Sequence, residues 1–131
     1  MEMSAEERAG GLAAAARVLR ADLIFAAETI AAHNHVEIVE APAAGSIMVE
    51  LETPVGSFCL TEVVVTRCAV RVEQRHGWAA VLGWDDEASL AAAILDAQPE
   101  VAQPIAAAAL GAEAGSRAAE MAAIAATRVE R

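Results

Sequence analysis

The sequence predicts an α+β fold, in which an antiparallel meander sheet of four or five strands packs helices mainly on one face. Two observations support this. The middle of the chain, from 36 to 83, is rich in β-branched residues. The segments on either side are rich in alanine and leucine and begin with helix-capping residues. We therefore expect a single domain over 1–131, with a helical part at 1–34, the sheet at 36–83 and a second helical part at 85–131.

The composition argues against several classes of function. Nine arginines and no lysine oppose nineteen acidic residues, which gives a net charge of −10. Binding to nucleic acid or to an anionic membrane needs cationic side chains that neutralise phosphates, so we expect neither. We see no transmembrane run and no signal peptide. We therefore expect a cytoplasmic protein in which Cys59 and Cys68 are reduced thiols.

The N-terminal part is predicted to be helical from about Ala5 to His33. Ser4 and Glu7 match the capping-box pattern at its start. A break near 20–22 is compatible with the sequence, because Asp22 could cap a second helix. Apolar residues recur at helical spacing throughout the segment: Leu12, Ala15, Ala16, Leu19, Leu23, Ala27 and Ile30.

The predicted sheet begins with a short strand at 36–39, a turn at 41–45 and an alternating strand at 47–52. After a turn at 54–56, a strand at 57–60 leads through a bend at 61–62 into the central strand, 63–73. A turn at 73–77 and a strand at 78–83 complete the sheet. Strand alternation divides the central strand between a core face and a second face. The core face carries Val64, Thr66, Cys68, Val70 and Val72, and the second face carries Val63, Val65, Arg67, Ala69, Arg71 and Glu73.

The C-terminal part is predicted to contain several helices. Asp85 is placed to cap a helix that ends near Gln98. Pro99 and Pro104 could each start a short helical piece, which Gly111 would close. A last helix is expected from 113 to 128. The buried stripe of the first of these helices is predicted to be Leu90, Ala91, Ile94 and Leu95.

The histidines and cysteines do not match a known metal site. Their spacing fits neither a Cys-x-x-Cys nor a His-x-x-x-His pattern, so we expect no bound metal. Cys68 lies on the predicted core face, where a thiol more often acts as a small hydrophobic residue than as a nucleophile. The residues concerned are His33, His35, His76, Cys59 and Cys68.

Glu62 and Asp85 are the carboxylates at strand ends that could serve as an acid or a base. Neither has a second carboxylate at a supporting spacing. We therefore favour a turn residue for Glu62 and a helix cap for Asp85.

Three arginines, Arg67, Arg71 and Arg75, recur every four residues, and a strand would place them on one face. One interpretation is contact with an anion or an acidic partner, because guanidinium pairs bidentately with carboxylate and phosphate. The other is pairing within the chain, with Glu50, Glu52 or Glu73. Both remain open for Arg67, whereas for Arg75 we favour the intrachain pair.

The central strand also carries a family resemblance. Thr66 to Val72, preceded by Phe58 and by Thr61 to Val63, resembles the central signature of the PhnG family, a subunit of the bacterial carbon–phosphorus lyase system. Downstream, Val81 to Asp85 looks like the strand-to-helix junction of that family. Ala91–Ala97 resembles the helix that follows in that family, and Ala125–Glu130 resembles the family's C-terminal ending. The chain departs from the family pattern at Thr61, where the family commonly has glycine, and lacks a Phe-Phe-Thr-like tail after Arg131.

The resemblance implies a role beside subunits H, I and L. Together these attach methylphosphonate to the ribose of ATP, displace adenine and form α-D-ribose 1-methylphosphonate 5-triphosphate. The family's complex also holds subunit J. The resemblance implies that subunit I carries the nucleosidase step, and we expect subunit I to be the direct contact of this chain.

On this resemblance the chain is a scaffold or accessory part of a multi-subunit transferase. It implies no catalytic residue and no bound cofactor here, with ATP and methylphosphonate as substrates of the complex. We expect the contacts with a partner or an anion to involve Arg67, Arg71, Glu62 and Thr66.

Two other functions remain open from the sequence. One is a stand-alone homodimeric binding module for a small anionic ligand, built on the arginine face. The other is an unrelated α+β interaction protein. A subunit studied alone should expose an apolar patch and self-associate, whereas a binding module should be well behaved and have a polar pocket.

Overall fold

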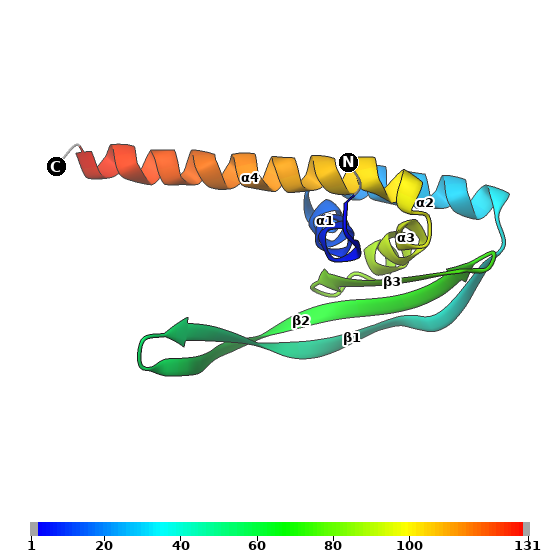
Figure 1. Ribbon diagram of the computed structural model, residues 1–131, viewed down its shortest axis with the longest axis horizontal. Helices are drawn as coiled ribbons and strands as arrows, with labels where there is room; N and C mark the ends of the chain where they lie inside the picture. The colour runs from blue at the N-terminus through cyan, green and yellow to red at the C-terminus, as the bar shows by residue number, and fades with distance from the viewer. Residues whose placement is uncertain (1–2, 130–131) are drawn as a thin grey trace.

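The computed structural model describes the backbone of residues 3–129 and the side chains of 3–48, 53–56, 62–119 and 122. Within this range the chain forms four helices and one antiparallel sheet of three strands, in the order β1-β2-β3. Helices α1 and α3 lie on one face of the sheet, and α2 and α4 lie farther from it (Figure 1). The predicted α+β class, with helices on one face, is confirmed.

The N-terminal part is divided into α1 (Ala5–Val18) and α2 (Arg20–His33). The predicted capping box is present, because the Ser4 hydroxyl accepts the Glu7 N–H and the Glu7 carboxylate accepts the Ser4 N–H. Leu19 ends the first helix and starts the second, close to 20–22, where the sequence allowed a break, but Asp22 lies in the first turn of α2 and does not cap it. Most of the predicted stripe is buried: Leu12, Ala15, Ala16, Leu23, Ala27 and Ile30.

The prediction of four or five strands is wrong, because pairs of predicted strands join into longer ones. The sheet consists of β1 (Val36–Thr53), β2 (Gly56–Val72) and β3 (Arg75–Leu82). The predicted turn at 41–45 is part of β1, and the predicted bend at 61–62 is part of β2. The register of β1 against β2 shifts between Ile38 and Glu40, between Glu40 and Ala43, and between Val49 and Glu50.

These shifts explain why the strands continue where a turn was expected. A β-bulge adds a residue to one strand without ending the pairing. β1 is also an edge strand, and an edge strand tolerates a proline whose missing N–H would have faced away from the sheet. Pro42 therefore lies within β1 without breaking it. The alternation predicted at 47–52 falls partly on side chains outside those described.

The turn between β2 and β3 is tighter than predicted. Val72 pairs with Arg75, so that only Glu73 and Gln74 form the turn and β3 begins at Arg75 rather than at 78. Glu73 has a φ of 55°, in the left-handed region that glycine usually occupies. Its carboxylate accepts the His35 N–H at 2.9 Å, which ties the turn to the start of β1.

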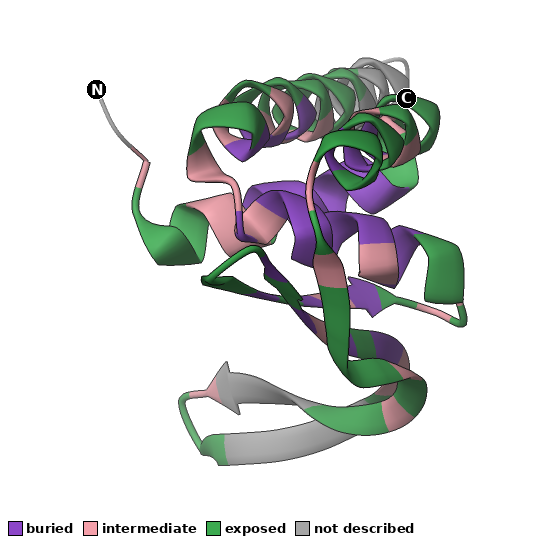
Figure 2. Ribbon diagram, turned by 90° about the vertical axis from the view of Figure 1, so that its right-hand side faces the viewer, coloured by how far each residue is buried: buried purple, intermediate pink, exposed green. Residues whose placement is uncertain are grey.

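The core lies between the sheet and the helices that cover it. Figure 2 shows the buried residues on the strands facing the helices and on the helices themselves. The predicted core face is confirmed for Thr66, Cys68, Val70 and Val72, which are buried. Val64 is only partly buried, and Val65 of the predicted second face is buried as well. Helix α3 (Asp86–Asp96) buries the predicted stripe almost completely, with Leu90 partly exposed.

Two glycines allow the layers to approach closely. A Cβ added at Gly77 of β3 would lie 2.0 Å from the carbonyl oxygen of Ala93 in α3. A Cβ added at Gly11 of α1 would lie 2.5 Å from Cβ of Ala106 in α4. Each contact excludes any side chain larger than hydrogen, so these positions set the spacing between the layers.

The predicted short pieces after Pro99 and the last helix are one helix, α4 (Pro99–Val129). Pro104 lies inside it and Gly111 does not close it. Proline removes the hydrogen bond of its own nitrogen and crowds the carbonyl four residues before it, but alanine, the best helix former, is frequent in the rest of the helix. Buried Ala102, Ala106 and Ala109 also hold this half of the helix against the body.

Beyond these contacts α4 projects past α1 (Figure 1), and its side chains from 114 to 119 are exposed. The apolar line predicted for its far end falls largely on side chains outside those described. Among the described residues, no helix joins the length to the hydropathy needed to cross a membrane.

Candidate functional site

The face of the sheet turned away from the helices is the main candidate for a functional surface. No helix of the described chain covers it (Figures 1 and 2). We call it the outer face. Following strand alternation and the observed register, it is formed by Glu37, Glu40, Ala43, Gly45, Val65, Arg67, Ala69, Arg71, His76, Trp78, Ala80 and Leu82.

The outer face exposes large apolar side chains. Trp78 is 47% exposed and Leu82 is 50% exposed, both on β3. Val65 lies between its cross-strand partners Gly45 and Leu82 and is itself buried. Trp84, just past the end of β3, is 81% exposed. Exposed aromatic and aliphatic side chains on an uncovered sheet face are typical of a docking surface.

The predicted alternation places Arg67 and Arg71 on the outer face, but their surroundings differ. Arg71 pairs with Glu37, its cross-strand neighbour on β1. Arg67 stands between Ala43 and Ala80 and has no ion pair within the described part of the chain. An exposed guanidinium among small apolar side chains can accept a carboxylate or a phosphate from another molecule.

Arg75 forms the intrachain pair that we favoured, although its partner lies on a helix. Its guanidinium lies 3.0 Å from Glu100 and 3.3 Å from the side-chain oxygen of Gln98. A hydrogen bond from its own backbone N–H, together with Arg75, holds the pKa of the Glu100 carboxyl below its usual range. Glu100 is none of the three partners that we considered: Glu73 accepts the His35 N–H instead, and Glu50 and Glu52 lie outside the described side chains.

The structure does not bring the four predicted contact residues together. Thr66 is 0% exposed on the core face. Its hydroxyl donates to the Gly83 carbonyl at 2.5 Å and accepts the Asp85 N–H at 3.0 Å. Glu62 is exposed, and strand alternation places it on the opposite side of β2 from Arg67. A contact with a partner or an anion therefore remains a prediction mainly for Arg67.

The helix-cap role of Asp85 is confirmed. Its carboxylate accepts the Ala88 N–H at 3.1 Å and binds the Arg20 guanidinium through two contacts of 2.9 Å. Arg20 also contacts Glu87 at 3.1 Å. The bond to Arg20, reinforced by the cap, holds the pKa of the Asp85 carboxyl below its usual range. Its acceptor positions are thus used to fix α3 to α2.

Cys68 is 1% exposed. Burial, followed by the charges of Asp86 and Glu40, raises the pKa of its thiol. A buried thiol with a raised pKa is a small core residue, as predicted. The Cys59 thiol lies outside the described side chains. Among the described residues, no three histidine, cysteine, aspartate or glutamate side chains come together as metal ligands would.

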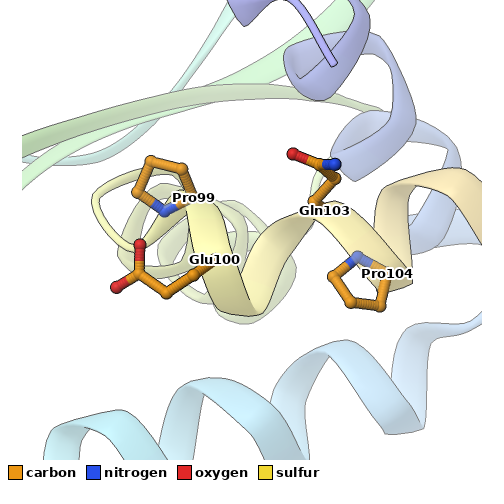
Figure 3. Close-up of a pocket in the computed structure, with 4 residues that line it drawn as sticks. All are labelled: Pro99, Glu100, Gln103 and Pro104. Carbon is orange, nitrogen blue, oxygen red and sulfur yellow. The ribbon is translucent and has the colours of Figure 1, made fainter. Parts of the chain in front are cut away.

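The surface hollows are shallow. The one in Figure 3 has a volume of about 320 Å³ and is lined by Pro99, Glu100, Gln103 and Pro104 at the start of α4. Gln103 and Pro104 point to opposite sides of that helix, so these side chains do not converge on one point (Figure 3). A second hollow of about 400 Å³ near the β2–β3 turn is lined by Arg71, Glu73, Gln74 and His76.

Sequence reasoning missed the apolar part of the outer face. Trp78 and Leu82 were predicted only as members of a returning strand. Their positions in an alternating segment, Trp78 to Leu82, were the available signal. It could be used only once the register had placed this strand beside Arg67.

Comparison with curated proteins gives no match to this chain. Comparison with protein-family models matches residues 6–130 to the family described as "Phosphonate metabolism protein PhnG". The match covers nearly the whole chain, including both arginine positions of the outer face, the Thr66 junction and α3. The chain therefore belongs to the PhnG family of phosphonate metabolism proteins.

Proposed function

We propose that this chain is a scaffold subunit of the carbon–phosphorus lyase complex. In this role it acts with subunits H, I and L in forming α-D-ribose 1-methylphosphonate 5-triphosphate from ATP and methylphosphonate, with release of adenine. Membership of the PhnG family supports the pathway. The observation that carries the scaffold role is the outer face, which combines exposed Trp78 and Leu82 with Arg67, an arginine that has no ion pair among the described residues.

The chemistry of that face suits a protein better than a small ligand. Interface cores are enriched in aromatic residues and arginine, and a single such arginine often carries much of the binding energy. Arg67 lies on β2 between its cross-strand neighbours Ala43 and Ala80. We expect Trp78 and Leu82 to be buried against a partner subunit, with subunit I the first candidate, and Arg67 to meet a carboxylate there.

The test is affinity purification of the tagged chain from its own cells, starved of phosphate and fed methylphosphonate, followed by mass spectrometry. We expect subunits H, I, J and L to follow the wild-type chain in stoichiometric amounts. Arg67→Glu should reduce their recovery about tenfold or more, because it reverses a charge at the centre of the contact. Recovery of the wild-type chain alone would overturn the proposal.

Arg117→Glu is the charge-matched control. It lies on α4, exposed and away from the outer face, and contacts only Glu113 at 3.5 Å among the described residues. We expect it to assemble like the wild-type chain. If Arg67→Glu assembles normally but loses binding of inorganic phosphate or a phosphonate, the alternative of a binding module for anions replaces the scaffold role.

A further inference from the structure

The sheet extends beyond the helices as a two-stranded ribbon. Strand β3 pairs with β2 only over 65–72, whereas β1 and β2 stay paired to their turn at 54–55. Residues 46–64 therefore form a ribbon with no third strand, and Figure 1 shows it projecting from the body on the same side as the far half of α4. A lone two-stranded ribbon is only marginally stable in water, so contact with another surface would stabilise it.

The register shows which backbone groups of β1 face outward. The Gly83 N–H donates to the Val64 carbonyl at 2.8 Å, so Val64 directs its backbone groups towards β3 and away from β1. Ser46, the partner of Val64, is then in a non-hydrogen-bonded pair with β2. By alternation the same holds for Ala44 and Met48, opposite Thr66 and Glu62.

The N–H and C=O groups of Ala44, Ser46 and Met48 therefore point away from the sheet. We call this stretch the open edge. The observed register gives these groups no partner on β2. The side chains there are also exposed, with Met48 at 61%. Unpaired donors and acceptors in a regular row are what an added β-strand requires.

The chain protects its other sheet edges against such pairing. On β1, Pro42 lacks an N–H, and the register shifts around it disrupt the row of donors towards the helical body. On the far side of the sheet, the Asp96 carboxylate accepts the outward N–H of Trp78 at 3.0 Å. Asp96 is itself held by Arg8 at 3.3 Å. Pairing is thus opposed at both of these places and left open along 44–48.

The charge of the ribbon indicates the kind of partner. Between 46 and 64 the sequence contains three glutamates and no arginine, lysine or histidine. The whole chain carries −10. A second copy would bring the same excess of negative charge to the contact, which opposes pairing of two such ribbons. A strand that carries lysine or arginine would instead be attracted.

We infer that the open edge accepts a β-strand from a basic segment of a partner protein, extending the sheet beyond β1. The inference rests on the proposed function, because it takes that partner from among the other carbon–phosphorus lyase subunits. Main-chain hydrogen bonds to Ala44, Ser46 and Met48 supply the pairing, and the acidic ribbon selects a basic strand. This contact uses the rim of the sheet, whereas the outer face contact uses its surface.

The test removes outward backbone N–H groups from the open edge and leaves the outer face unchanged. The double variant Ser46→Pro/Met48→Pro lacks two outward N–H groups, as Pro42 does naturally, and leaves the bonds between β1 and β2 in place. Ser46→Ala/Met48→Ala is the matched control, because it shortens the same side chains and keeps both donors. Each variant is purified as the assembled complex from cells that contain all the subunits.

We expect recovery of the partner subunits to fall about tenfold to a hundredfold for the proline variant and less than threefold for the alanine control. Recovery should also fall as salt is raised, because the contact joins opposite charges. Hydrogen exchange of the wild-type complex should show the Ser46 and Met48 amides slowed at least tenfold relative to the isolated chain.

The outcomes separate the two proposals. If the wild-type chain recruits no subunit, both fail. If it recruits them and the proline variant recruits them equally, with no slowing of the Ser46 and Met48 amides, only the open-edge inference fails. If these amides are instead slowed by self-association of the isolated chain, the partner is a second copy, and the inference of a basic partner is wrong.

Discussion

Two residues of β2 that could have been contact residues instead hold the fold together. Thr66 was predicted as a contact residue, yet its hydroxyl joins β2 to the junction between β3 and α3. Arg71 shares a face with Arg67 but is neutralised by Glu37. The partner of Arg71 depends on the register of β1 against β2, which the bulges of β1 set, and the partners of Thr66 depend on the register of β2 against β3. Neither register could be identified from the sequence. The alternation itself, which separates Arg67 from the core, could be predicted and was.

Replacing Thr66 by valine tests the junction. Valine keeps the shape but leaves the Gly83 carbonyl and the Asp85 N–H without their partner in a buried setting. We expect a loss of about 2 kcal/mol in the free energy of unfolding, measured by urea denaturation. Hydrogen exchange at the Asp85 amide should also become faster.

Thr66→Ser is the control, because it keeps the hydroxyl and removes only a methyl group. It should cost about 1 kcal/mol and leave the Asp85 amide protected. If the valine and serine variants show equal exchange at Asp85, the hydroxyl does not hold the junction.

At the scale of elements, the sequence identified helix starts better than strand ends. Ser4 and Asp85 cap helices as predicted, because a cap depends on neighbours within one turn. Pro42 suggested a turn and Gly111 a helix end, but both lie inside continuous elements. Whether a breaker ends an element depends on tertiary context: an edge strand accepts Pro42, and packing on the body holds α4 through Pro104 and towards Gly111.

Two glycine-to-alanine substitutions should change stability in opposite directions. Gly77→Ala would push a Cβ into the Ala93 carbonyl and force α3 away from β3, at a cost of about 2–3 kcal/mol. Gly111→Ala places a Cβ where nothing lies within 4 Å, inside a helix, and should stabilise the chain by about 1 kcal/mol. Urea denaturation of both variants measures the two effects; equal stabilities would contradict the close packing of α3 on β3.

At the scale of the whole molecule, two properties oppose each other. The uncovered outer face favours association, whereas a net charge of −10 keeps copies apart. We therefore expect the isolated chain to self-associate weakly, and more strongly at 0.5 M than at 0.05 M salt, because salt screens the repulsion. Sedimentation velocity at the two salt concentrations measures this.

Trp78→Ser/Leu82→Ser should abolish that self-association by removing the apolar part of the outer face. Phe25→Ser is the control, because Phe25 is 71% exposed on α2, away from the sheet. If the Phe25 variant no longer self-associates and the outer-face variant still does, the surface that mediates self-association lies on the helices instead.

The contact of the Asp96 carboxylate with the Trp78 N–H affects how far an assembly can grow by strand addition. A sheet that can be lengthened on both sides can be built into a fibre of unlimited length. Here Arg8 holds Asp96 against the edge of β3, where Asp96 occupies the outward N–H of Trp78. If strands join at the open edge of β1 alone, each copy of the chain ends the sheet, and an assembly that grows by strand addition stops where this protein has been incorporated.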